Sequence, residues 1–378
     1  MADGADPLHV DIDRMIAAKA AGPVAKPADD AEFLRRVTLD LAGRVPTFKE
    51  ATDFHADSAA DKRAKLIDRL LASADFPRRM QEWFEVMVLE RRAESSIKTE
   101  DWSKWVQAGF RDNTPWNQLV AKLLFVEKDD AANQPATKFL KATGRGGNAH
   151  QVTQDIARIF LGRDIMCAQC HNHPSVEVYT QQDYFGIFSY VQEQPAKANS
   201  EFESVFIPGK KTTGPRLPGG QEIEVPKFEK GQEQEAAKFR PRMMLARDLP
   251  SDTNQAFVRT SVNRLWALLL GRGLVHPAHL DHPANPPSHP ALFERLQQEF
   301  ARRIKLNHPD VITVFGGPNY PSDISKQQEF LQQHREIDFY VEGEGEYPFV
   351  GLFRALSAVG FDGSKIKLDI ITLISSSA

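Results

Sequence analysis

The sequence predicts a mainly α-helical protein: a helical domain with a Cys-x-x-Cys-His turn, a β-hairpin insert, and a partial βαβα, Rossmann-like unit near the C-terminus. Three observations support this fold class. Apolar residues recur at helical spacing through residues 8–192 and again through 248–303. Residues 193–247 are instead rich in Gly, Pro, Lys and Gln around short β-like pieces. Over residues 304–367 strand-like and helical runs alternate, as in parallel α/β folds, before a tail at 368–378.

Length and composition narrow the possible functions. The chain of 378 residues is long enough for several domains with substantial cores. Its charged fraction of 26% and hydrophobic fraction of 41% are ordinary for a globular protein, and the net charge of −4 gives no reason to expect nucleic acid as a partner. No apolar run approaches the roughly 20 residues of a membrane span. Two cysteines, close together, exclude a disulfide framework.

Capping residues predict where the first helices begin and end. Asp29 or Asp30 can begin a helix that ends at Gly43, and Thr47 with Glu50 has the spacing of a capping box. Apolar helical faces occur at residues 8–22, 33–41, 66–71, 80–88, 102–110, 116–124 and 152–160, and a further capping-box pair, Thr180 and Asp183, precedes one at 184–191.

The remaining elements follow the same logic. Short β-like pieces at 203–207 and 221–225 predict the exposed hairpin of the insert. Helical spacing resumes at 257–269, closed by Gly271, and again at 292–300. Strands are expected at 311–315 and 337–341, each followed by a helix, through residues 330–331 and 349–356.

The most informative stretch is Cys-Ala-Gln-Cys-His-Asn-His-Pro at residues 167–174, which holds both cysteines of the chain. Two thiols separated by two residues can form thioether bonds to the two vinyl groups of one haem. The next residue, His171, would then be the proximal ligand of the iron. The motif follows one apolar helix and precedes another, so it is expected in a turn between them.

Two alternatives remain open. Cys167, Cys170, His171 and His173 can instead hold a zinc or iron ion, with an outside ligand to relieve the strain of so short a segment. The thiols can also be bystanders in an ordinary turn of a non-catalytic scaffold. Under the haem hypothesis the second axial ligand is unassigned, and the candidates are His276, His279 and His282 in a proline-rich loop at 276–290.

Residues 10–192 resemble the planctomycete-type cytochrome-like domain of unknown function. The resemblance is carried by the stretch from Phe33 to Pro46, by 62–73, and by 153–191 with its CAQCHNHP sequence. Residues 248–300 are similar to the start of the domain that usually follows it, through Val-Asn-Arg-Leu-Trp at 262–266 and Gly-Arg-Gly-Leu-Val at 271–275.

This resemblance implies haem binding through Cys167, Cys170 and His171 and a role in electron transfer with an unknown redox partner, but no established reaction. It also implies export, to the periplasm for example, because covalent haem attachment normally follows export. The first residues of the chain contain no recognisable signal peptide.

Residues 304–367 are similar to the cobalamin-binding domain of certain radical S-adenosylmethionine enzymes. The likeness lies in residues 308–319, 337–341 and 343–346 and implies part of a Rossmann-like fold. The chain lacks an Asp-x-His-x-x-Gly sequence and the three-cysteine iron–sulfur motif, so cobalamin-dependent radical chemistry is disfavoured. The change of resemblance near residues 301–308 suggests a fused, chimeric reading frame.

Overall fold

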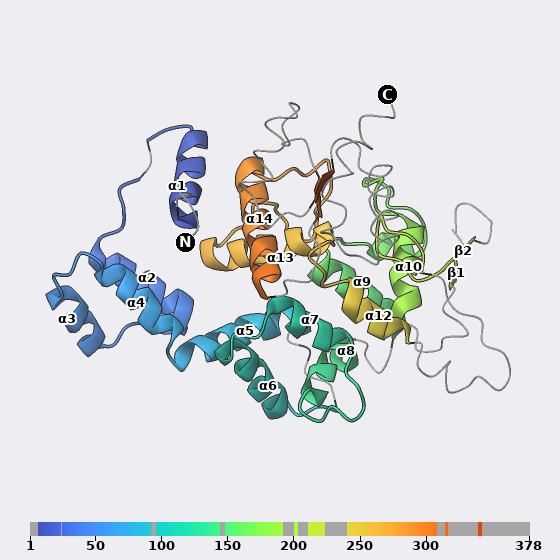
Figure 1. Ribbon diagram of the computed structural model, residues 1–378, viewed down its shortest axis with the longest axis horizontal. Helices are drawn as coiled ribbons and strands as arrows, with labels where there is room; N and C mark the ends of the chain where they lie inside the picture. The colour runs from blue at the N-terminus through green and yellow to red at the C-terminus, as the bar shows by residue number, and fades with distance from the viewer. Residues whose placement is uncertain are drawn as a thin grey trace. The chain divides into compact units, whose positions relative to one another are not determined.

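The computed structural model describes residues 7–23, 25–90, 92, 96–143, 148–191, 200–202, 211–223, 240–307, 314–316 and 339–341. Most of these residues are helical (Figure 1). The first eight α-helices are α1 (Leu8–Lys19), α2 (Asp30–Ala42), α3 (Phe48–Ala56), α4 (Lys62–Leu71), α5 (Asp75–Leu89), α6 (Thr99–Arg111), α7 (Trp116–Leu124) and α8 (Lys138–Thr143). The others are α9 (Ala149–Phe160), α10 (Gln181–Val191), α12 (Pro241–Asp248), α13 (Gln255–Leu270) and α14 (Pro290–Asn307), with 3-10 turns η1 (Gln134–Thr137) and η2 (Met166–Gln169).

Several of the described helices begin or end at residues whose side chains suit those positions. Asp29 accepts a hydrogen bond from the Glu32 amide at the start of α2, and Gly43 ends that helix in the left-handed conformation, with φ +69°. Thr47 and Glu50 form the predicted capping box at the start of α3. Asn254 begins α13 and Gly271 ends it, so the predicted helix positions are confirmed here.

Two hydrophobic clusters lie in the described part of the chain. The larger contains aromatic and aliphatic side chains from α5, α6, α7, α9 and α10, among them the fully buried Phe84, Trp102, Ile156 and Tyr184. A smaller cluster joins α2, α3 and α4 through Leu34, Phe54, Leu66 and Leu70. The chain divides into two compact units, Met1–Glu294 and Arg295–Ala378, and the larger cluster lies wholly within the first.

The predicted β-hairpin was wrong. Residues 221–223 form no strand: the Ile223 amide donates to the Pro215 carbonyl at 2.8 Å, so this segment folds into a compact turn. Leu217 and Ile223 then pack on the larger cluster instead of pairing as strands. The other predicted piece, 203–207, lies outside the described residues. The pairing that the structure describes in this region joins two three-residue segments, β1 (Ser200–Phe202) and β2 (Lys211–Thr213).

The predicted Rossmann-like βαβα unit is also corrected. In this region the structure describes the end of α14, to Asn307, and then β3 (Val314–Gly316) and β4 (Phe339–Val341), which pair in parallel over three residues. A parallel α/β unit needs longer strands covered by helices. The predicted helices near 330–331 and 349–356 lie outside the described residues. The described chain is a helical protein with a few very short strand pairs, and not a helical protein with an α/β unit.

Candidate functional site

The Cys-x-x-Cys-His motif lies where the sequence predicts it, in the connection between α9 and α10. Residues Met166–Gln169 form the 3-10 turn η2. The amides of Cys170 and His171 both donate to the Cys167 carbonyl, at 3.2 and 3.3 Å, which closes the turn around the two cysteines. Both thiols are free; Cys170 is exposed and Cys167 is partly exposed. Both cysteines of the turn are therefore at least partly exposed to solvent.

The turn is attached to α9 and α10 through a line of polar side chains. Gln169, between the two cysteines, accepts a hydrogen bond from the Gln154 amide group at 3.1 Å. On α10, the buried Tyr184 hydroxyl lies 2.9 Å from Nδ1 of His150. Burial raises the pKa of the Tyr184 phenol, with an opposing hydrogen bond from Gln154. Burial lowers the pKa of His150.

The hydrogen bond of His171 determines which of its nitrogens carries the proton. Nδ1 lies 2.7 Å from the carbonyl oxygen of Asn172. A carbonyl oxygen can only accept, so Nδ1 is the donor and, in the neutral ring, the lone pair is on Nε2. Donation from Nδ1 to a backbone carbonyl is the arrangement commonly found in histidines that bind metals through Nε2.

His173 has the opposite arrangement. Its Nδ1 accepts hydrogen bonds from the amides of Ser175 and Val176, at 3.2 and 3.1 Å. In the neutral ring the proton is therefore on Nε2, and the lone pair of Nδ1 is directed at two backbone amides. The ring also lies edge-on against Tyr179, with the centroids 5.7 Å apart. His173 stabilises the loop after the motif and has no lone pair available for a metal.

The proline- and histidine-rich loop after α13 lies against the segment that carries the motif. The Asp164 amide donates to the His279 carbonyl at 2.9 Å, and the Asp281 amide donates to the Gly162 carbonyl at 3.0 Å. Between these bonds, Arg163 and Leu280 form an isolated antiparallel β-bridge. Segments more than a hundred residues apart in sequence are thus joined directly beside the cysteines.

Tyr179 connects this loop to the motif. It is fully buried, and its hydroxyl donates to the Asp281 carbonyl at 3.1 Å. Its own carbonyl accepts from the His173 amide at 2.9 Å, and its ring lies edge-on to His282, with centroids 6.0 Å apart. Burial raises the pKa of the Tyr179 phenol, so the hydroxyl remains protonated as a donor. Sequence reasoning missed Tyr179, because a lone tyrosine in a loop has no spacing signal.

Two arginines of α13 complete the attachment. Arg259 donates to both carboxylate oxygens of Asp281, at 2.9 and 2.8 Å. Arg264 donates to the carbonyls of Ile159 and Arg158, at 2.8 Å each, at the end of α9 just before the motif segment. Burial, with repulsion from Arg158, lowers the pKa of Arg264 to about 10. Arg264 belongs to the Val-Asn-Arg-Leu-Trp sequence, which sequence analysis identified. The hydrogen bonds of Arg264 to the end of α9 could not be predicted from it.

The predicted site residues do not converge on a metal site in this structure. Across the described part of the chain, no three or more His, Cys, Asp or Glu side chains are grouped closely enough to hold an ion. Cys167, Cys170 and His171 share one turn, whereas the Nδ1 atom of His173 faces backbone amides. Of the three loop histidines, His279 and His282 contact the motif segment as described above, and neither is joined to a cysteine.

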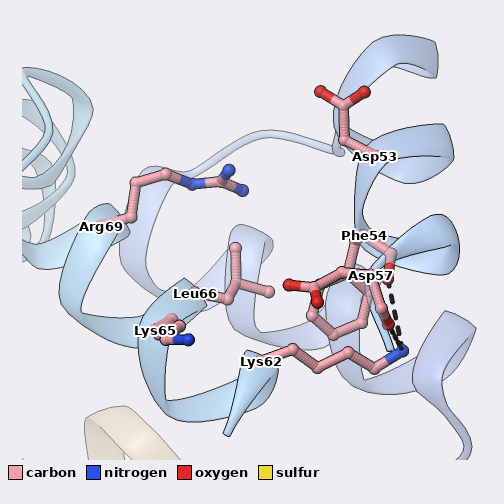
Figure 2. Close-up of a pocket in the computed structure, with 7 residues that line it drawn as sticks. All are labelled: Asp53, Phe54, Asp57, Lys62, Lys65, Leu66 and Arg69. Carbon is pink, nitrogen blue, oxygen red and sulfur yellow. Dashed lines mark hydrogen bonds between the residues drawn. The ribbon is translucent and has the colours of Figure 1, made fainter. Parts of the chain in front are cut away.

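A separate pocket of about 200 Å³ lies between α3 and α4 (Figure 2). Its charged side chains are Asp53, Asp57, Lys62, Lys65 and Arg69. Lys62 donates to the Asp57 carbonyl at 3.0 Å, Lys65 pairs with Asp61 and Asp53 pairs with Lys49. Asp53 and Lys65 thus have charged partners within the helical pair, Lys62 also pairs with Asp30 of α2, and none of the predicted site residues lines this pocket.

Comparison with known families agrees with the division of the chain around the motif. Residues 11–195 match the PSCyt2 family model. It is described as a protein of unknown function (DUF1549). Residues 241–307 match a second model, PSD1, also described as a protein of unknown function (DUF1553). The predicted resemblance over residues 10–192 and 248–300 is therefore confirmed.

The PSCyt2 segment contains the Cys-x-x-Cys-His turn, and the PSD1 segment contributes Arg259, Arg264 and the loop with Asp281. Neither match extends to residues 308–378, so the resemblance to a cobalamin-binding domain receives no support, and most of its quoted residues lie outside the described part. No curated protein and no solved structure shows significant similarity to the chain. None of the described helices is long and apolar enough to cross a membrane.

Proposed function

We propose that this protein binds haem covalently, as a c-type cytochrome does, with Cys167 and Cys170 forming the thioether bonds and His171 the proximal ligand. The observation that carries the proposal is the hydrogen bond from Nδ1 of His171 to the Asn172 carbonyl. It leaves the ring with its lone pair on Nε2, the form in which histidine binds iron. Haem bound there would supply one-electron chemistry, and the corresponding role is electron transfer.

The two thiols suit this chemistry. Both are free and both reach the surface, which thioether formation with haem vinyl groups requires. Gln169 and the buried Ala168 hold the segment between the cysteines against α9 and the core. The side chains that would react are thus accessible while the backbone that carries them is fixed.

The competing proposal is a non-haem zinc or iron site formed by Cys167, Cys170, His171 and His173. The hydrogen bonds that His173 accepts at Nδ1 argue against it, because a four-ligand site of these residues needs that imidazole as a donor. An ion held by the two thiolates and His171 would still need a ligand from elsewhere.

Co-expression with a haem-maturation system tests the proposal. We expect purified protein with a Soret absorption band and with haem that stays attached after denaturation, because thioether bonds are covalent. Replacing Cys167 and Cys170 together by serine is expected to abolish attachment. His173→Ala is the matched control, since it removes a histidine of the same segment that we do not assign to iron, and it is expected to retain haem.

Two outcomes would overturn the proposal. Colourless protein from an expression host that matures a known c-type cytochrome would contradict haem binding. Zinc or iron found by elemental analysis without porphyrin, and lost in His173→Ala, would establish the competing metal site instead.

A further inference from the structure

Asn172 connects the histidine of the motif to the start of α10. Its carbonyl oxygen accepts the hydrogen bond from Nδ1 of His171, at 2.7 Å. Its side-chain oxygen Oδ1 accepts from the Gln181 amide at 2.9 Å, in the first turn of α10. Asn172 therefore accepts a hydrogen bond from the His171 ring at its backbone carbonyl, and its side chain is bonded to α10.

The anchoring helix is well held. The amide of Asp183 donates to the Thr180 hydroxyl at 3.1 Å, and the Asp183 carboxylate pairs with Arg216. Tyr184 and Ile187 of the same helix are fully buried in the larger cluster. The Gln181 amide, which donates to Asn172, thus belongs to a firmly packed helix, α10. Asn172 itself is exposed.

We infer that Asn172 is a positioning residue for His171, a role that rests on the proposed function. The Asn172 carbonyl belongs to the peptide whose amide, that of His173, donates to the Tyr179 carbonyl at 2.9 Å. The bond from Oδ1 to α10 is a second restraint on the same residue, and together they keep the carbonyl where it accepts the Nδ1 proton of His171. Without the bond to α10 the carbonyl has more freedom, and a larger share of the His171 rings carries the proton on Nε2. Mutation of a residue that hydrogen-bonds to a metal ligand typically lowers metal affinity by roughly 10- to 100-fold.

A matched set of variants isolates the side-chain bond. Asn172→Leu keeps the branched shape of asparagine but has no acceptor, and Asn172→Asp keeps an oxygen in the same place. A carboxylate at the start of α10 is also compatible with the helix dipole. Both variants leave the backbone carbonyl present, so any difference between them reports on the bond to Gln181.

The first readout needs no haem. Nitrogen-15 NMR of the imidazole rings in haem-free protein distinguishes the protonated nitrogen from the unprotonated one. We expect His171 of the unmodified protein and of Asn172→Asp to show a single form with the proton on Nδ1, and Asn172→Leu to show a mixture. His173 should show the proton on Nε2 in all three, as an internal control. The same mixture, or the same single form, in all three proteins would overturn the inference.

The second readout uses the haem-loaded protein. The iron–histidine stretching frequency of the reduced, five-coordinate form, measured by resonance Raman, rises with hydrogen-bond donation from Nδ1. It is expected to be lower in Asn172→Leu than in the unmodified protein and to be restored in Asn172→Asp. Equal frequencies in the three would contradict the inference while leaving haem binding intact. Failure to attach haem would instead contradict the proposed function, with the NMR result unaffected.

Discussion

At the scale of single residues, the site is defined by hydrogen bonds that a motif does not contain. The sequence places Cys167, Cys170, His171 and His173 together, with His171 as a ligand in both the haem and the metal hypotheses and His173 in the metal hypothesis alone. The structure separates the two histidines, because one donates from Nδ1 to a carbonyl and the other accepts at Nδ1 from two amides. Which nitrogen carries the proton depends on backbone groups placed by folding, so residue types and spacing alone do not predict it.

Tyr179 provides a prediction at this scale. Tyr179→Phe removes only the hydroxyl that donates to the Asp281 carbonyl. Because that carbonyl is then left without its donor, we expect the free energy of unfolding to fall by about 1 kcal/mol. Denaturant-induced unfolding measures this. Tyr190→Phe is the control, since Tyr190 is also buried but its hydroxyl donates to no described residue. An equal loss of stability in both variants would contradict a specific role for the Tyr179 bond.

At the scale of elements, helices were the predictable part of this protein. The capping box of α3, the left-handed Gly43 and the end of α13 at Gly271 are local signals, and each has its expected place in the structure. The predicted hairpin failed because Ile223 and the residues around it are apolar for another reason, their packing on the larger cluster. A short apolar segment cannot reveal from sequence alone whether it pairs as a strand or packs as a turn.

The capping box of α3 provides a prediction with a defined pH dependence. Hydrogen bonds from Arg44, then those from Thr47, lower the pKa of Glu50 to about 2, against a value of 4.5 without these partners. A lowered pKa means that the carboxylate stabilises the fold above pH 4.5 and that this contribution is lost as the pH falls toward 2. The pair is partly exposed, so we expect Glu50→Gln to cost only about 1 kcal/mol at pH 7.

Hydrogen exchange of the α3 amides at pH 7 and pH 3 checks this. Protection in Glu50→Gln should be lower than in the unmodified protein at pH 7, and the difference should shrink at pH 3. Lys49→Met, which removes a highly exposed pair with Asp53, should change protection little at either pH. A difference that grows on acidification would refute the assignment.

At the scale of the whole molecule, the two family segments are not independent. Through Arg264 and the loop of Asp281, the PSD1 segment contacts the end of α9 and the segment that leads into the cysteine pair. Arg259 binds that loop to α13 through Asp281. Sequence comparison gave both segments but not their contact, because the interacting residues are more than a hundred positions apart and no local pattern links them. The fold of residues 304–367 was predicted wrongly because short strand-like runs do not show how long the strands are or what covers them.

The pair of Arg259 and Asp281 tests this coupling. Arg259→Met leaves the largely buried carboxylate of Asp281 without the two hydrogen bonds from Arg259, so we expect a loss of about 1–2 kcal/mol of unfolding free energy. We also expect faster hydrogen exchange in residues 162–179 as well as in 276–285. Arg111→Met breaks a comparable two-bond pair with Asp112 that is fully on the surface, and it should change neither quantity measurably. Faster exchange confined to 276–285 would show that the segments are not coupled.

The bridge between Arg163 and Leu280 has a practical consequence for anyone who shortens the gene. A fragment that stops after residue 195 keeps both cysteines and the whole PSCyt2 match, yet it discards the carbonyl that receives the Tyr179 hydroxyl and the backbone partners of Gly162 and Asp164. Its cysteine loop would face water on the side now covered by Asp281. Haem attachment or thiol reactivity measured on such a fragment would therefore describe a cysteine loop without the contacts that the 276–285 loop makes with it.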